Sequence, residues 1–289
     1  MSARHPILGI TGSSGAGTSS AVRVFERLFA ALALKAVIIE GDAYHSLDRE
    51  GNRKAIERAR IRGENFSLFG PQGNHLDRLQ ALLREYGEKG TGTTRHYLHS
   101  DAEAAEHGHP VGTFTPWEPI PAGTDVLFYE GLHGGYVGED ADIASHMDLL
   151  IGVVPVINLE WIQKLHRDKN LRGYSHEAVV STILRRMPDY VNYIVPQFSR
   201  THVNFQRVPT VDTSNPFIAR DIPTADESMV VIRFADPKGI DFPYLLEMLH
   251  DSMMTRPNSI LVPGGKMGLA MQLIFTPMIL RLLDLKRRA

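Results

Sequence analysis

The sequence predicts an α/β fold with a mixed, mainly parallel sheet flanked by helices. Apolar runs alternate with amphipathic segments over the first half of the chain, which is the pattern of βαβ units. These runs are apolar throughout, as strands covered on both faces must be. Further apolar runs follow later and make the sheet mixed. The early runs span 7–10, 36–39, 126–129 and 149–154, and the later ones span 208–211, 229–234 and 260–262.

Helices are predicted between these strands from the spacing of apolar residues. The first follows residue 18 and shows its apolar side chains at helical intervals: Ala21, Val24, Phe25, Leu28 and Leu32. Residues 158–170 and 177–193 also read as helices, whereas residues 91–124 show no clear periodicity and are expected to form a long functional loop. No linker divides the chain, so we expect a single domain over residues 1–289.

Composition excludes several classes of protein. The net charge of −2 gives no global positive field, so neither nucleic acid nor a membrane is an expected partner. The chain has no cysteine, which rules out disulfides, thiolate metal sites and thiol redox switches. The apolar stretch 267–285 is interrupted by Gln272, Pro277 and Arg281 and is expected to be a buried or interface helix. The N-terminus lacks a signal-peptide pattern, so we expect a cytoplasmic protein.

A glycine-rich turn follows the first strand and leads into a helix. It matches the P-loop pattern of Gly, four residues, Gly, Lys and Ser or Thr, except that Thr18 replaces the lysine. Such a turn binds nucleotide phosphates through backbone N–H groups and a helix N-terminus, and Ser19 stands where a hydroxyl ligates Mg²⁺. A simple strand-to-helix turn is the alternative. The predicted nucleotide-binding residues are Gly12, Ser13, Ser14, Gly15, Ala16, Gly17, Thr18 and Ser19.

Two acidic residues follow neighbouring strands. Asp42 comes after the second strand and Glu130 ends the third, and the carboxyl ends of parallel strands meet at the edge of the sheet where ligands bind. Either carboxylate can accept a proton from a substrate hydroxyl or hold Mg²⁺. A helix cap or a turn acid is the structural alternative for each. Their joint position beside the phosphate turn favours a catalytic role.

His45 and Arg49 lie four residues apart after Asp42, so they would share a helical face that can bind a substrate phosphate. The basic residues at 53–62 alternate with glutamates and are interpreted as a solvated helix face rather than a nucleic-acid patch.

A second basic segment covers residues 159–173. Lys164, Arg167, Asp168 and Arg172 are three or four residues apart and project from one side of a helix. Cations placed there would stabilise a transferred phosphoryl group, and Lys164 or one of the arginines would replace the missing P-loop lysine. An exposed, salt-bridged helix is the alternative.

Other polar clusters are less specific. The loop histidines show no recognisable ligand spacing for a metal, and polar roles near a sugar phosphate are favoured; they are His96, His99, His107 and His109. An anionic effector or an ordinary surface position remains open for the arginines at 185, 186, 233 and 256.

Several long segments together resemble the bacterial type of the phosphoribulokinase family, within the wider P-loop uridine kinase/phosphoribulokinase family. The resemblance covers nearly the whole chain and is far more specific than a P-loop alone. It includes the lysine-free P-loop and residues 40–45, 129–134, 153–164, 196–199, 211–218 and 240–244.

The resemblance implies transfer of the ATP γ-phosphoryl group to the C1 hydroxyl of ribulose 5-phosphate, which gives ribulose 1,5-bisphosphate for carbon fixation. It implies homo-oligomers, commonly octamers, that NADH activates and AMP inhibits. Carried over by position, Asp42 would be the general base and His45 and Arg49 would hold the sugar phosphate. Ser19, Glu130 and Asp168 would serve Mg²⁺, and Lys164, Arg167, Asp168 and Arg172 would serve catalysis.

Two other functions remain open at this point. A uridine kinase would share the P-loop and the Arg-Asp-x-x-x-Arg-Gly pattern at 167–173. A nucleotide-gated binding protein without phosphotransfer is disfavoured, because such a switch needs no base for a substrate hydroxyl.

Overall fold

A computed structural model describes residues 4–170 and 172–288. At its centre is one sheet with the strand order β2-β5-β1-β6-β7-β8-β10-β9. The first five strands of that order run parallel and the last three run antiparallel, which confirms a mixed, mainly parallel sheet. The strands are β1 (Ile7–Thr11), β2 (Ala36–Glu40), β5 (Val126–Gly131), β6 (Leu149–Val153), β7 (Val203–Pro209), β8 (Ser228–Phe234), β9 (Met253–Arg256) and β10 (Ser259–Pro263).

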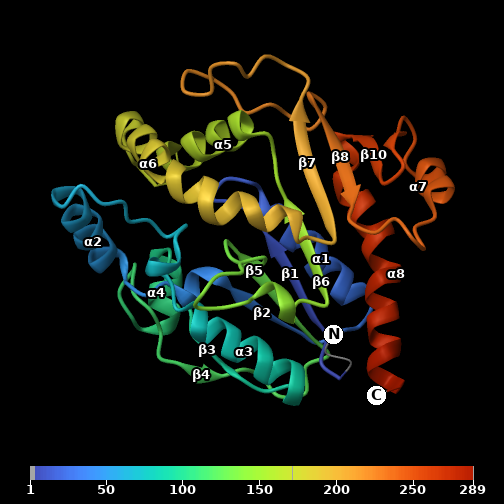
Figure 1. Ribbon diagram of the computed structural model, residues 1–289, viewed down its shortest axis with the longest axis horizontal. Coiled ribbons are helices and arrows are strands. Elements are labelled where there is room, and N and C mark those ends of the chain that lie inside the picture. The colour runs from blue at the N-terminus through green and yellow to red at the C-terminus, as the bar shows by residue number, and fades with distance from the viewer. Residues whose placement is uncertain (1–3, 171, 289) are drawn as a thin grey trace.

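Helices flank this sheet and extend the molecule at both ends. Figure 1 shows α2, α4 and α6 at one end and α7 and α8 at the other, with the sheet between them. The helices are α1 (Thr18–Ala31), α2 (Arg49–Ile61), α3 (Leu76–Lys89), α4 (Asp101–His107), α5 (Ile157–Asn170), α6 (His176–Asp189), α7 (Phe242–Met248) and α8 (Met267–Arg288).

Two cores lie on opposite faces of the sheet. On one face α1 and α8 pack together, and the ring of Phe25 lies 4.8 Å from that of Phe128 and 5.1 Å from that of Phe275. On the other face α3 buries Leu79, Leu83 and other apolar residues against the same strands. Alternating residues of β1, β2, β5 and β6 therefore serve different cores, which explains why these strand sequences are apolar on both faces.

The C-terminal helix α8 is the one described helix that is long and apolar enough to cross a membrane by length and composition. Its buried residues pack against α1 and the sheet in the first core. They recur at helical spacing: Ala270, Met271, Ile274, Phe275, Ile279 and Leu283. This is the packing of a core helix with one exposed side.

The structure differs from the predicted elements in three places. Strand β7 begins at Val203, because residues 203–205 pair with β6 before the predicted start at 208. The helix predicted over 177–193 ends at Asp189 and continues as a π-helical turn, Tyr190–Ile194, after Pro188. Proline has no N–H to donate, and it disturbs the regular helix.

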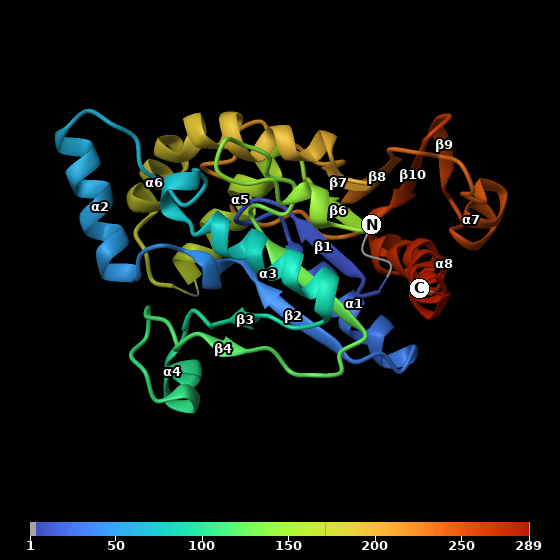
Figure 2. The same cartoon turned by 60° about the horizontal axis from the view of Figure 1, so that its bottom comes forward.

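The third difference is the segment at 91–124, which is more ordered than a long loop. It contains α4, whose N-terminus is capped by the Ser100 side chain. It also contains the paired strands β3 (Thr93–Thr94) and β4 (Glu118–Pro119) (Figure 2). These pieces are only a few residues long, and sequence periodicity does not detect elements of that length.

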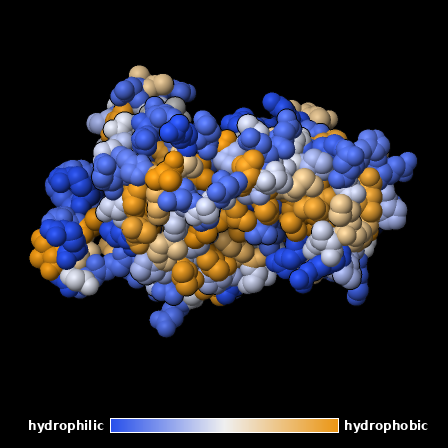
Figure 3. All heavy atoms as spheres, turned by 90° about the horizontal axis from the view of Figure 1, so that it is seen from above, coloured by the Kyte–Doolittle hydropathy of each residue, from blue (hydrophilic) through white to orange (hydrophobic). Residues whose placement is uncertain are grey.

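The surface carries mixed polar and apolar residues. In Figure 3 apolar residues lie along the middle of the face, and hydrophilic residues dominate its ends. The charges of α2 form exposed pairs within the helix and just after it, which confirms a solvated helix face: Arg53 with Glu50, Arg60 with Glu57 and Arg62 with Glu64.

Candidate active site

The ends of β2, β5 and β1 meet at one edge of the sheet, as predicted. Glu40 pairs in register with Glu130, and Thr11 pairs with Gly131. This edge opens into a cavity of about 850 Å³. Among the residues that line it are Gly12, Ser13, Ser14, Gly15, Thr18, Ser19, Asp42, His45, Arg49, Glu130, Lys164, Arg167, Asp168 and Arg172. The cavity thus brings together almost every residue that the sequence singled out.

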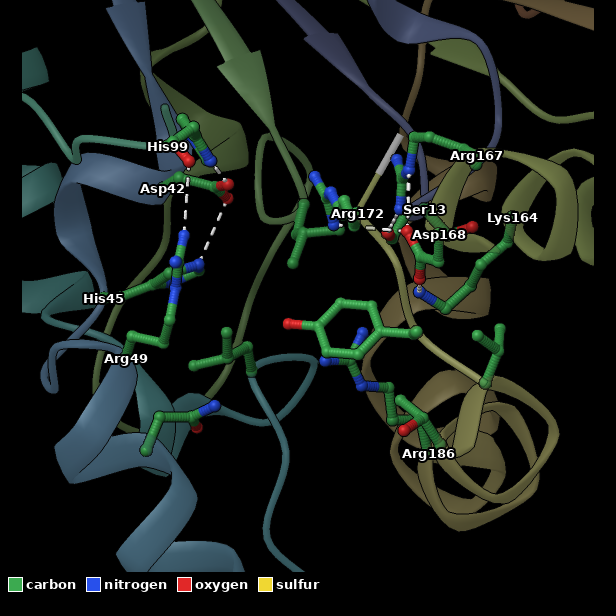
Figure 4. A pocket seen from close by; sticks show the side chains of 18 of the residues that line it. Ser13, Asp42, His45, Arg49, His99, Lys164, Arg167, Asp168, Arg172 and Arg186 are labelled. Carbon is green, nitrogen blue, oxygen red and sulfur yellow. Dashed lines mark hydrogen bonds and ion pairs between the residues drawn. The ribbon is translucent and has the colours of Figure 1, made fainter. Parts of the chain in front are cut away.

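Figure 4 shows that the cavity has two opposed sides. Asp42, His45, Arg49 and His99 lie on one side, and the cluster of Lys164, Arg167, Asp168 and Arg172 lies on the other beside Ser13. An adjoining cavity of about 590 Å³ is also lined by Asp42, His45, Arg49, His99 and Arg172. The space between the two sides is therefore bordered by an acid on one side and by cations on the other.

The glycine-rich turn needs its glycines for close packing. A Cβ atom on Gly12 would lie 2.7 Å from the Val153 carbonyl oxygen. Gly15 has a φ of +107°, and a Cβ there would lie 2.9 Å from the Glu160 carbonyl oxygen. The turn therefore rests directly on α5, which brings the basic helix close to the phosphate site. Of the predicted nucleotide-binding residues, Ala16 is buried and, with Gly17, lies outside the cavity lining.

Asp168 is the centre of the basic cluster. Its carboxylate lies 2.5 Å from Lys164 Nζ, 3.0 Å from Arg167 Nε and 3.3 Å from Arg172 Nη1. Arg167 also donates through Nη2 to the Ser14 hydroxyl at 2.9 Å, which ties the cluster to the glycine-rich turn. Asp168 therefore orients three cations here, and the Mg²⁺ role that the sequence predicted for it stays a prediction.

Lys164 is buried beneath the turn and keeps an ionised partner. Burial, and then the nearby Arg186, lower the pKa of Lys164 to about 8. Asp168 opposes this shift, and Lys164 in turn helps to lower the pKa of Asp168 against the effect of its own burial. Both groups are therefore charged at neutral pH, so a buried cation lies beside a turn whose P-loop lysine is replaced by Thr18.

Asp42 is paired with two histidines. Its Oδ1 lies 3.1 Å from His45 Nε2 and its Oδ2 lies 3.5 Å from His99 Nε2. The Asp42 side chain is 41% exposed because it opens into the cavity. Burial of the residue would raise its pKa, but His45 and then His99 and Arg172 outweigh burial and hold the pKa of Asp42 well below its usual range. Asp42 is therefore ionised and able to accept a hydrogen bond from a substrate hydroxyl.

Asn74 orients the His45 ring through a hydrogen bond at its Nδ1. The Asn74 amide nitrogen donates to the carbonyl oxygens of Leu68 and Gly70, so its Oδ1 is free to accept, and His45 Nδ1 lies 2.8 Å away from it. His45 Nδ1 must then carry a proton. The other ring nitrogen, Nε2, faces the Asp42 carboxylate.

Glu130 provides an acidic group that contacts the turn through Thr18. Burial raises its pKa, and a hydrogen bond from Thr18 opposes that rise. The pKa of Glu40, its neighbour in register, is raised by burial as well. The Glu130 carboxylate could provide one ligand of a divalent cation, with the Ser19 hydroxyl at the start of α1 in the same cavity.

A Mg²⁺ ion would have few protein ligands here. Among residues 4–170 and 172–288, no group of three or more His, Cys, Asp or Glu side chains is placed to hold a metal ion. Mg²⁺ commonly binds through one or two protein groups, substrate phosphates and water. Glu130 and Ser19 fit that arrangement.

Sequence reasoning missed several residues that the fold brings to the cavity. Arg185 and Arg186 of α6 line it, although the sequence left them as effector or surface residues. Tyr174 lines both cavities, and Tyr97 lines the smaller one. The Arg-Arg pair at 185–186 was visible in the sequence, but nothing local shows that α6 packs beside α5.

The remaining candidates lie elsewhere. Arg233 donates to the Phe198 carbonyl oxygen, and Arg256 is exposed on β9. His96 and His107 stack on each other with ring centroids 5.3 Å apart. Of the loop histidines, His99 is the one that lines the cavity.

The fold and the site together define a P-loop phosphotransferase. A glycine-rich turn between β1 and α1 faces an ionised acid across a cavity, and a cationic cluster borders the space between them.

Comparison with known proteins gives the family. Residues 7–214 match the model of the phosphoribulokinase / uridine kinase family, and the chain belongs to this family. It is 65% identical to the chromosomal phosphoribulokinase of Cupriavidus necator, over 100% of this chain and 99% of that protein. It is 60% identical to the phosphoribulokinase of Nitrobacter vulgaris, with 100% of both chains covered. The solved phosphoribulokinase from Rhodobacter spheroides superposes with a TM-score of 0.91 at 53% identity and 99% coverage of both chains.

Proposed function

We propose that this chain phosphorylates the C1 hydroxyl of D-ribulose 5-phosphate with ATP, which gives ribulose 1,5-bisphosphate and ADP for carbon fixation. The observation that carries this proposal is the position of Asp42. It lies on the side of the cavity opposite the glycine-rich turn and the Lys164 cluster, and all of these groups line one space. Full-length relatives that bear the name phosphoribulokinase support the same substrate.

The residues divide the reaction between the two sides. The nucleotide phosphates would lie on the turn at 12–19. Asp42 would accept the proton of the C1 hydroxyl as the bond to phosphorus forms. His45 and Arg49 would hold the 5-phosphate, since both line the smaller cavity next to Asp42.

The cationic cluster would act on the phosphoryl group as it is transferred. Lys164, Arg167 and Arg172 would stabilise charge on the γ-phosphoryl oxygens, while Asp168 keeps the three cations oriented. Mg²⁺, held by Ser19 and Glu130 with the nucleotide phosphates, would neutralise charge on the β- and γ-phosphates when bound. This chain lacks a P-loop lysine, and Lys164 takes over its charge.

The test is a coupled assay of ADP release with ATP and Mg²⁺. Ribulose 5-phosphate should support turnover, and uridine should support far less. A clear preference for uridine would reject the ribulose proposal, and nucleotide binding without ADP release would favour the gated binding protein instead.

Further properties of this function follow from the family resemblance. We infer that the chain acts as one kinase domain in the cytoplasm and assembles as a homo-oligomer, for which the family resemblance implies eight subunits. NADH would be an allosteric activator, with its site near Arg233 or Arg256; Arg186, the third residue that the sequence offered for it, lines the catalytic cavity. Light scattering of the purified protein tests the assembly, and assays with and without NADH test the regulation. A monomer, or rates that NADH does not change, would contradict these inferences.

A further inference from the structure

Arg95 lies outside the groups described so far and holds the strand end that carries the proposed base. It follows β3, which pairs with β4 in the segment at 91–124 (Figure 2). Its Nε donates to the Ala43 carbonyl oxygen at 2.8 Å and its Nη2 donates to the His45 carbonyl oxygen at 2.7 Å. One planar guanidinium therefore forms hydrogen bonds to the backbone on both sides of Tyr44.

Two aromatic rings fix the plane of this guanidinium. Its central carbon lies 3.6 Å from the centroid of the Phe114 ring and 4.6 Å from that of Trp117. Trp117 also packs edge-on against Tyr44, with ring centroids 5.5 Å apart. Contacts between a guanidinium and aromatic faces restrict its orientation, and partial burial strengthens them. Arg95 is thus oriented by the rings of Phe114 and Trp117 while it binds the backbone that follows β2.

The carbonyl oxygens of three successive residues, 43 to 45, each accept a hydrogen bond from a residue that is distant in the sequence. The Tyr44 carbonyl oxygen accepts from the His75 backbone N–H at 2.7 Å, between the two carbonyl oxygens that Arg95 binds. His45 contacts Asp42 through its side chain and donates its backbone N–H to the Asp42 carbonyl oxygen. A shift of this segment would therefore move Asp42 and His45 together.

We propose that Arg95 is a positioning residue that sets the place of Asp42 and His45 relative to the glycine-rich turn. This inference rests on the proposed function for its kinetic readout. Lysine cannot replace arginine here, because an ammonium is not a planar fork and cannot stack between two rings while it binds two carbonyl oxygens. A misplacement of about 1 Å in a catalytic group can cost roughly 10²-fold in rate.

The experiment compares Arg95→Ala with Arg78→Ala. Arg78 also lies over Trp117, with its central carbon 5.0 Å from the ring centroid, and it serves as the matched control for lost stacking. We expect kcat of Arg95→Ala to fall about 10- to 100-fold. The KM for ATP should stay within about twofold of wild type, because Arg95 binds the backbone at 43 and 45 and not the turn at 12–19. Arg78→Ala should keep kcat within about twofold.

Chemical rescue separates positioning from general damage. Millimolar guanidinium can enter the slot between Phe114 and Trp117 in Arg95→Ala, and it should restore kcat about fivefold or more. It should not stimulate wild type or Arg78→Ala. Arg95→Lys, which keeps the charge and the stem, should still lose at least about fivefold in kcat, and it takes the place of the alanine variant if that variant does not fold.

A readout without substrate keeps this proposal distinct from the proposed function. Hydrogen exchange of the backbone at 41–47 should quicken in Arg95→Ala and Arg95→Lys, and it should slow again in Arg95→Ala with guanidinium. If the wild-type enzyme failed to turn over ribulose 5-phosphate, the exchange result would still decide on Arg95. Wild-type kcat in Arg95→Lys, or unchanged exchange at 41–47, would overturn the proposal.

Discussion

Lys164 Nζ lies 2.5 Å from Asp168 Oδ2, one turn further along α5, so a carboxylate on the same helix orients this buried cation. Arg167 and Arg172 bind the other oxygen of the same carboxylate. A cluster of three cations around one acid has excess positive charge, which suits a polyphosphate more than a neutral substrate.

Replacement of Lys164 by methionine should impair phosphoryl transfer more than folding. Methionine keeps most of the buried stem and removes the charge, so we expect kcat/KM for ATP to fall by at least about 10²-fold. Steady-state kinetics and a thermal melt measured on the same preparation check this. Lys169→Met, at an exposed position near the end of α5, is the control. Near-normal turnover of Lys164→Met would remove Lys164 from the mechanism.

Replacement of Asp42 by asparagine should abolish the base but leave the nucleotide site intact. We expect kcat to fall roughly 10²- to 10⁴-fold, the usual contribution of a general base. The dissociation constant for ATP, measured by calorimetry, should change little because Asp42 lies across the cavity from the turn. Asp48→Asn, which removes a carboxylate charge but keeps an oxygen that can accept the cap hydrogen bond from Gly51, provides a comparison variant. A turnover rate close to wild type would rule out the base role.

The activity should depend on pH through Lys164. Its pKa is lowered to about 8, so its ammonium is charged below that pH and loses its proton as pH rises through it. The kcat/KM for ATP reports the free enzyme, and we expect it to decline above about pH 8. Lys164→Arg should move this decline to higher pH, since a guanidinium stays charged. An unchanged profile in that variant would assign the decline to another group.

Glu160 should make stability fall as pH rises, which is the opposite sense from an acid whose pKa is lowered by folding. Burial, opposed by hydrogen bonds and by Lys164, raises the pKa of Glu160 from 4.5 to about 7. The folded state thus binds a proton that the unfolded state releases between those values, and the stability linked to this proton is lost as pH rises from about 4.5 to 7.

Glu160→Gln should lack this loss. Thermal melts at pH 5 and pH 8 should show that the free energy of unfolding of the variant rises relative to that of wild type as pH rises. The difference should be on the order of 3 kcal/mol at most, since one pKa unit is worth about 1.4 kcal/mol. The exposed Glu26 provides the control variant, Glu26→Gln, whose difference from wild type should be flat. A pH-independent difference for Glu160→Gln would show that Glu160 is ionised in the folded protein.

Much of the fold and the central part of the site could be predicted from the sequence. The strands β1, β2, β5 and β6 were detectable because each contains an unbroken apolar run, and their parallel arrangement places Asp42, Glu130 and the glycine-rich turn around one cavity at the same edge of the sheet. Spacing also predicted that Lys164 and Asp168 share a helical face, because that relationship lies within one helix.

The rest could not be predicted because it depends on contacts between distant segments. Asn74 orients His45 from 29 residues away, and Arg95 reaches back to Ala43 over 52 residues. Neither residue belongs to a motif. Asp168 was expected near Mg²⁺, but its three cationic neighbours converge on it through the α5 helix and the segment that follows, and spacing alone cannot rank those partners.

The antiparallel end of the sheet affects how the protein can associate with other chains. Strand β9 is the last in the order, pairs on one side with β10 only, and exposes Met253, Met254 and the rest of its residues. An outermost strand with free backbone groups can accept a further strand. The cavity lies at the distant end, toward α2 and α6. Strand addition at β9 would therefore lengthen the sheet without obstructing entry of either substrate.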